Sequence, residues 1–193
     1  NGQPIYATRD YGSGFIGRDQ HYQGNGTPST LLNLSQQLRF GPWELSAQLD
    51  AQLGYDLLNI TQARLDNPTI FGSNSPLVFD RWTPTNPSNK YPRALAAGSL
   101  DNGVFSSVIV EDASYLRLKN VSLGYRVPST LTQKARVKSL RVYASATNLW
   151  TLTDYSGYDP EANAFGQSTS VIGVDRGGYP QAKTYIVGLN IGF

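Results

Sequence analysis

The strongest pattern in the sequence is a strict alternation of apolar and polar residues from Trp43 to Tyr55. Every second residue of this segment is apolar or aromatic, and the residues between them are polar or Gly. A period of two is typical of a strand with one apolar face. Just before it, Leu32, Leu34, Leu38 and Phe40 alternate with polar residues, and Gly41-Pro42 separates the two segments. The pattern therefore predicts a β-hairpin over residues 30–55.

The same alternation returns three times later in the chain. It covers residues 121–127, 140–146 and 184–193, where Ile186 is the exception. These segments predict a second hairpin over 115–150 and a final strand over 184–193.

Two leucines interrupt the regularity of the second hairpin. Leu116 and Leu118 fall on the opposite parity from Val121. A β-bulge near Lys119-Asn120 would return all three side chains to one face, and a strand end clear of the apolar layer is the alternative.

The connections between these strands differ greatly in length. Gly41-Pro42 and 128–139 are short, whereas residues 1–29, 56–114 and 151–183 form long segments rich in Gly, Pro, Asn and Ser. A soluble domain rarely carries a loop as long as 56–114 between neighbouring strands. Transmembrane barrels combine short periplasmic turns with long extracellular loops, and we assign the two groups accordingly.

Strand length also favours a membrane barrel over a soluble β-sandwich, in which strands alternate too. The 13 residues from Trp43 to Tyr55, tilted near 45°, rise roughly 30 Å, enough for the apolar band of an outer membrane. Their aromatic ends match the two interface girdles of such barrels. Five strands cannot close a membrane barrel, so we expect others from another chain or from a missing upstream part. We expect polar side chains to face the barrel interior and apolar ones to face lipid, as in the two sets Glu44, Gln48, Asp50 and Leu45, Leu49, Leu53.

Composition excludes several kinds of chemistry. Charged residues make up 16% of the chain, which is below the ~25% of soluble domains. Cys is absent and His21 is the single histidine, which excludes a disulfide framework, a thiolate centre and a multi-histidine metal site. A net charge of +2 without a basic stripe argues against nucleic-acid binding. We expect no enzyme activity and no cofactor.

Five motifs, in order along the chain, resemble the SusC/RagA family of TonB-dependent outer-membrane transporters. They are Arg81–Pro87 with Lys90–Arg93 (RWTPTNP…KYPR), Glu111–Tyr125 (EDASYLRLKNVSLGY), Leu140–Leu149 (LRVYASATNL), Tyr155–Glu161 (YSGYDPE), and Gly178–Gln181 with Gly188–Phe193 (GYPQ…GLNIGF).

This resemblance implies an all-β fold, a transmembrane antiparallel β-barrel of 22 strands of which this chain supplies the last five. It implies location in the outer membrane of a Gram-negative bacterium and import of oligosaccharides or peptides. The implied partners are the rest of the barrel with its plug, a SusD-like surface lipoprotein, TonB acting through the missing N-terminal part, and outer-membrane lipid. The alternative is a secreted β-sandwich adhesin or glycan-binding module.

Candidate site residues fall into three groups, and none is catalytic. Loop aromatics could contact substrate or the SusD-like lipoprotein, with packing inside the loops as the alternative. The last strand could act as a barrel-assembly signal. Three loop carboxylates form a weak Ca²⁺ candidate beside Asn163, with a solvated loop as the alternative. The groups are Trp82, Tyr91, Tyr155, Tyr158, Phe165 and Tyr179; Tyr185, Val187, Leu189, Ile191 and Phe193; and Asp154, Asp159 and Glu161.

Overall fold

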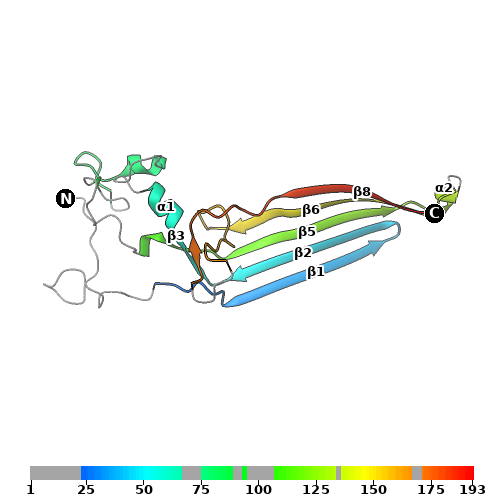
Figure 1. The fold of residues 1–193 in the computed structure, drawn as a ribbon, viewed down its shortest axis with the longest axis horizontal. Helices are drawn as coiled ribbons and strands as arrows, with labels where there is room; N and C mark the ends of the chain where they lie inside the picture. The colour runs from blue at the N-terminus through cyan, green and yellow to red at the C-terminus, as the bar shows by residue number, and fades with distance from the viewer. Residues whose placement is uncertain (1–22, 67–74, 89–92, 95–106, 134–135, 167–170) are drawn as a thin grey trace.

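A single sheet of five long antiparallel strands dominates the computed structural model, which describes residues 23–66, 75–88, 93–94, 107–133, 136–166 and 171–193. The strands lie side by side in chain order (Figure 1). All five strands expected from the alternation are present, so that part of the prediction is confirmed. They are β1 (Thr30–Phe40), β2 (Trp43–Leu53), β5 (Tyr115–Arg126), β6 (Ser139–Thr153) and β8 (Thr184–Gly192).

The hairpin between β1 and β2 has the shortest possible connection. Phe40 pairs with Trp43, so Gly41 and Pro42 alone form the turn. Gly41 has a φ of 56°, a conformation that side chains disfavour and that two-residue hairpin turns require at this position. The sequence therefore fixes both the place of the turn and the register that follows from it.

The register sorts side chains onto one apolar and one polar face. Leu45 of β2 lies opposite Leu123 of β5, whereas Gln48 lies opposite Asn120. The same sorting continues into β6 and β8, where even Ile186, on the polar face, pairs with Ser145. The exposed large side chains of the apolar face are Leu32, Leu34, Leu38, Phe40, Trp43, Leu45, Leu53, Leu123, Val142, Trp150, Leu152, Tyr185, Val187, Leu189 and Ile191.

A bulge keeps β5 in step with this sorting. The register with both neighbours shifts between Leu118 and Asn120, where Lys119 is the extra residue. Leu118 then pairs with Leu49, and Val121 with Ala47, so both lie on the apolar face. The bulge interpretation of the sequence is confirmed.

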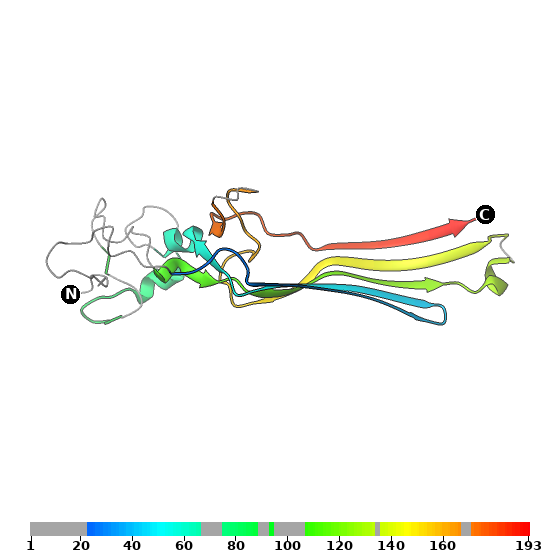
Figure 2. The ribbon, with the colours of Figure 1, turned by 90° about the horizontal axis from the view of Figure 1, so that it is seen from below.

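The long strands form one layer, as Figure 2 shows. Among the described residues no second sheet stacks on the apolar face, so they do not form the sandwich considered from the sequence. A small sheet instead lies beyond the ends of β2 and β5, in the order β4, β3, β7. Its strands are β3 (Asp56–Asn59), β4 (Val110–Asp112) and β7 (Val174–Asp175), and β3 and β7 run parallel. The sequence analysis placed all three in loops.

Short helices complete the described chain. None of the helices in this part is long and apolar enough to cross a membrane. The turn between β5 and β6 holds one helical turn and lies at the opposite end of the sheet from the small sheet. The helices are α1 (Ile60–Leu65), η2 (Pro76–Asp80), η4 (Ser107–Ile109) and α2 (Ser129–Thr132).

A compact apolar core lies where the long sheet meets the small one. Tyr55, Leu57, Ala113, Tyr115 and Tyr155 are all buried there. The long strands themselves bury few apolar side chains: Ala51 and Ala146 are the buried aliphatic residues among those described in β1, β2, β5, β6 and β8. Burial is therefore concentrated at the end where the long connections emerge, which we call the loop end; the opposite end is the turn end.

Candidate functional site at the loop end of the sheet

Five charged side chains meet on the polar face at the loop end, and we call them the loop-end cluster. Arg117, only 3% exposed, donates to Asp159 at 2.7 Å and to Glu161. Lys119 lies 3.0 Å from Glu161 and 3.3 Å from Asp50. Two strands of the sheet and the connection after β6 therefore contribute to one ion-pair network.

The sheet pattern explains why the two cations reach this site. Tyr115, Arg117 and Lys119 occupy alternate positions of β5 and share its polar face. Arg117 pairs in register with Asp50, which brings the aspartate of β2 beside the cations.

The connection after β6 supplies the two other carboxylates in a hydrogen-bonded turn. Asp159 accepts from the backbone N–H of Glu161 at 3.0 Å and from that of Gln181 at 2.8 Å. Burial raises the pKa of Asp159, but the bonds from Gln181 and Arg117 outweigh it and hold the pKa below its usual value. Asp159 is therefore an ionised anchor for both the loop and Arg117.

Tyrosine hydroxyls fasten the same loop. Tyr55 donates to the carbonyl of Pro160 at 2.7 Å, and Tyr115 lies 2.7 Å from Glu161. Tyr155 donates to Asp175 at 2.7 Å, and burial together with this carboxylate raises the pKa of Tyr155. The hydroxyl of Tyr155 thus stays protonated and donates over the whole physiological range.

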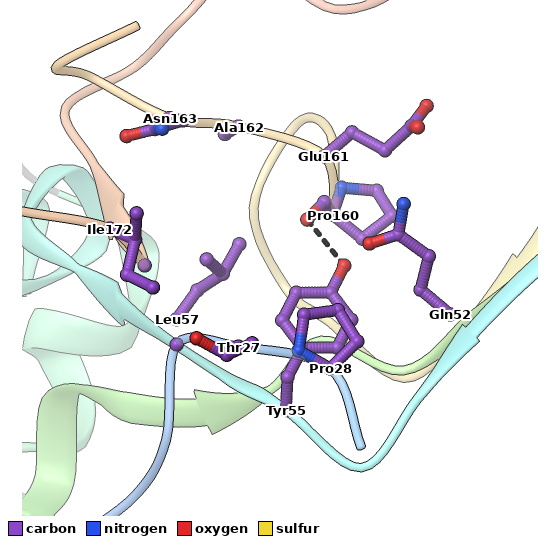
Figure 3. A pocket seen from close by; sticks show the side chains of 12 residues that line it. Thr27, Pro28, Gln52, Tyr55, Leu57, Pro160, Glu161, Ala162, Asn163 and Ile172 are labelled. Carbon is purple, nitrogen blue, oxygen red and sulfur yellow. Dashed lines mark hydrogen bonds between the residues drawn. The ribbon is translucent and has the colours of Figure 1, made fainter. Parts of the chain in front are cut away.

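A cavity of about 300 Å³ opens beside this fastened loop. Figure 3 shows Tyr55 and Pro160 at its wall, with Glu161 and Gln52 on one side and Ile172 across from them. The described lining of the cavity includes neither His nor Cys. Its one carboxylate, that of Glu161, accepts a hydrogen bond from Arg117. The described lining carries no pair of groups for acid–base or nucleophilic chemistry.

The loop aromatics singled out from the sequence do not gather into one site. Tyr158 and Tyr179 are 69% and 94% exposed, and Phe165 lies 5.1 Å from the guanidinium of Arg176. Tyr155 is buried in the core, where its ring packs with protein rather than facing a solvent-filled space. Trp82 is half-buried, and Tyr91 lies outside the described residues.

Two of the three carboxylates of the calcium candidate form ion pairs with basic side chains. Arg117 pairs with Asp159 and Glu161, and Lys119 pairs with Glu161. Asp154 is an exposed residue just after β6. Within the described ranges no three His, Asp or Glu side chains are arranged to hold a metal ion. The two carboxylates close an ion-pair network, a role that their spacing from Arg117 in the sequence did not reveal.

The proposed assembly strand, β8, is the outermost strand beside β6. The register sets its alternate residues from Tyr185 to Ile191 opposite apolar residues of β6, on the apolar face. Val187 is 79% exposed and Phe193, after the strand, is 81% exposed.

Comparison with known proteins identifies relatives over the whole chain. No family model matches. The chain is 33% identical to TonB-dependent receptor P3 of Formosa agariphila, over 100% of this chain and 19% of that protein. It is 27% identical to TonB-dependent receptor SusC of Bacteroides thetaiotaomicron, over 100% of this chain and 18% of that protein. Its structure matches the RagAB peptide importer in the 'closed-closed' state with a TM-score of 0.77 and 26% identity, over 94% of this chain and 19% of that one.

These comparisons confirm the resemblance inferred from the motifs. The chain spans about a fifth of the length of the curated relatives that it matches. That share agrees with a C-terminal portion of a SusC/RagA-type TonB-dependent receptor.

Proposed function

We propose that this chain, which matches SusC/RagA-type TonB-dependent receptors from end to end, forms the last five wall strands of an outer-membrane nutrient importer. In this role β1, β2, β5, β6 and β8 lie in the bilayer, and the connections at the loop end lie outside the cell. The transporter would take up oligosaccharides or peptides, with energy supplied through TonB.

The contrast between the two faces of the sheet carries this proposal. A continuous exposed surface of leucine, valine and aromatic side chains on one face suits contact with lipid. The other face carries Gln48, Asn120 and Ser122 beyond the loop-end cluster, as the wall of a water-filled interior requires. A soluble single-layer sheet with this much exposed apolar surface would aggregate.

The two edges of the sheet support the same conclusion. Within the described residues β1 pairs with β2 alone and β8 with β6 alone, so each has one unpaired edge. In a bilayer those backbone groups require partners, because no water is available to them. Further barrel strands on both sides would satisfy them.

The long connections favour a role at the cell surface. Residues 56–114 and 151–183 emerge at the loop end, where exposed aromatics such as Tyr158 and Tyr179 lie. We propose that part of this surface contacts a SusD-like lipoprotein and part contacts substrate. Exposed tyrosines suit both roles.

Protease accessibility on intact cells tests the topology. Protease added outside should cut within 56–114 or 151–183 and leave the turn 128–139 intact, and co-expression of the lipoprotein should reduce the cutting. The same cells, fractionated, should hold the full-length protein in the outer membrane. Cutting of 128–139 from outside would invert the proposed orientation, and a soluble product free of membrane would contradict the barrel.

A further inference from the structure

A second charged cluster lies on the polar face at the turn end, formed by Arg39, Glu44, Arg126 and Arg141. The carboxylate of Glu44 forms ion pairs with all three guanidiniums, at N···O distances of 2.6 Å to Arg126, 2.9 Å to Arg141 and 3.5 Å to Arg39. The four residues come from β1, β2, β5 and β6. We call them the turn-end cluster.

The backbone register forces this arrangement. Arg126 of β5 lies directly opposite Arg141 of β6, a pairing of like charges that destabilises a sheet. Glu44 pairs across the strands with Arg39 on one side and with Gly124 on the other. Gly124 precedes Arg126 by two residues, so Glu44 lies next to the Arg126–Arg141 pair on the same face. One carboxylate therefore serves three cations.

A glycine makes room for the long reach of Arg141 from β6 to β2. A Cβ at Gly124, in the intervening strand, would lie 2.7 Å from Nη2 of Arg141, so the guanidinium passes over that glycine. Tyr143 lies over Gly188 in the same manner, and the guanidinium of Arg141 is 5.1 Å from its ring. The cluster is thus built into four adjacent strands.

The cluster carries more positive charge than it neutralises. Three guanidiniums bring fifteen N–H donors, and among the described residues all three form ion pairs with the single carboxylate of Glu44. The side chains of Arg39 and Arg126 are 63% and 59% exposed, whereas Glu44 is 11% exposed. The side chains of Arg39 and Arg126 therefore offer exposed N–H donors on the polar face.

We infer that the turn-end cluster is a docking site for an acidic polypeptide segment inside the barrel, from the part of the full-length transporter that this chain does not include. This inference rests on the proposed function, which turns the polar face inward. Lipid phosphates would have to reach the polar face, which lies opposite the apolar, lipid-facing one. The relatives are about five times as long as this chain, and a segment from the rest of such a protein can lie within the barrel. Carboxylates match the fork geometry of exposed guanidiniums.

Photo-crosslinking in the full-length transporter tests the docking site while all three arginines stay in place. Ser46 lies on the polar face of β2, two residues beyond Glu44, and is a suitable position for a benzophenone amino acid. Crosslinked peptides are identified by mass spectrometry from purified outer membranes. Leu45, its neighbour on the apolar face, is the matched control position and should yield lipid adducts.

We expect Ser46 to crosslink to an Asp- or Glu-rich peptide of the same polypeptide. The double variant Arg39→Gln/Arg126→Gln should lower that yield about tenfold, and Arg39→Lys/Arg126→Lys should largely preserve it. Adducts with lipid, adducts with a segment lacking carboxylates, or a yield unchanged by the Gln variant would overturn the inference. Outer-membrane fractionation of the same samples separates the two proposals: a correctly located barrel without the acidic adduct refutes the docking site alone.

Discussion

The two ends of the polar face carry charged clusters that differ in how their charges are completed. At the loop end, Arg117 and Lys119 meet three carboxylates, two of which come from the chain's own connection after β6. At the turn end, three arginines meet one carboxylate of the described residues, that of Glu44. The first network is closed by the described chain, and the second has surplus cations.

Burial follows the same division. The side chain of Arg117 is 4% exposed, because the connection covers it, whereas that of Arg126 is 59% exposed. A buried cation must be paired, since an unpaired charge away from water costs several kcal/mol. An exposed surplus of cations costs little and leaves donors free for a partner. The loop-end cluster therefore fixes a loop, whereas the turn-end cluster keeps exposed cations on the polar face.

Removing Arg117 should have the largest effect, because it would leave Asp159 and Glu161 partly buried without their main partner. We expect Arg117→Met to destabilise the docked loop by about 3–5 kcal/mol, measured by hydrogen exchange over 154–162 in the folded, membrane-embedded protein. Arg126→Met is the matched control at the turn end, where an exposed ion pair should contribute under about 1 kcal/mol. Equal losses in the two variants would remove the distinction between the ends.

Both clusters lie on the face that we assign to the barrel interior, and mid-strand substitutions test this assignment. Leu49 and Gln48 are neighbours on opposite faces of β2. We expect Leu49→Arg to cost about 2–4 kcal/mol near the bilayer midplane and Gln48→Arg to be mild. The measurement is the free energy of unfolding of the transporter reconstituted in lipid. Equal tolerance of the two arginines would contradict the assignment of faces.

Acid should release the loop end through Asp159, with a smaller effect than loss of Arg117. The pKa of Asp159 is lowered in the folded protein, so its contribution is complete above its unfolded pKa of about 3.9. That contribution falls as the pH drops through the lower, folded pKa. Protease cutting within 154–162 should therefore rise below about pH 4.

An isosteric variant supplies the control for this titration. Asp159→Asn keeps the shape of the side chain and removes the charge, so cutting should be raised at neutral pH and should depend less on pH. A variant with the same steep acid response as the unchanged protein would assign the titration to another group.

These contrasts could be predicted from the sequence only in part. Alternation identified all five long strands, and the parity of Leu116 and Leu118 indicated the bulge at Lys119, because both signals are local. The sorting of faces followed from the same period of two. These features depend on residues within one strand or one hairpin.

The loop end escaped prediction because its contacts join distant segments. Arg117 meets Asp159 and Glu161 across more than forty positions of the chain, and β3, β4 and β7 are two to four residues long. Neither feature leaves a periodic pattern. One signal was available: Arg117 and Lys119 share the parity of the polar face, which implies polar partners for them.

Tyr155 illustrates the same limit. Its place in a Gly- and Pro-rich connection suggested a surface role, whereas the structure buries its ring beside Tyr55 and bonds its hydroxyl to Asp175. Burial of a loop aromatic depends on which segments cover it, and local composition does not report that.

A small stability effect is expected at Phe193, which lies at the turn end of the molecule (Figure 1). Its side chain is 81% exposed and follows Ile191 by two residues, continuing the apolar face of β8. At the periplasmic girdle its burial should contribute about 1–2 kcal/mol to the folded barrel. Deleting Phe193 should therefore lower heat stability only slightly.

A role in assembly would give the same deletion a second, separate effect. Before folding, the unpaired edge and patterned face of β8 form a template for strand addition by an assembly machine. If β8 is read in this way, the amount of barrel in the outer membrane should fall steeply, while the protein that does fold keeps nearly normal heat stability. Quantitative immunoblotting of outer membranes and heat-dependent gel mobility measure the two quantities on the same cells. Unchanged abundance with a loss of about 1 kcal/mol in stability would reduce Phe193 to a girdle residue, and the turn end would then lose one of its two proposed binding roles.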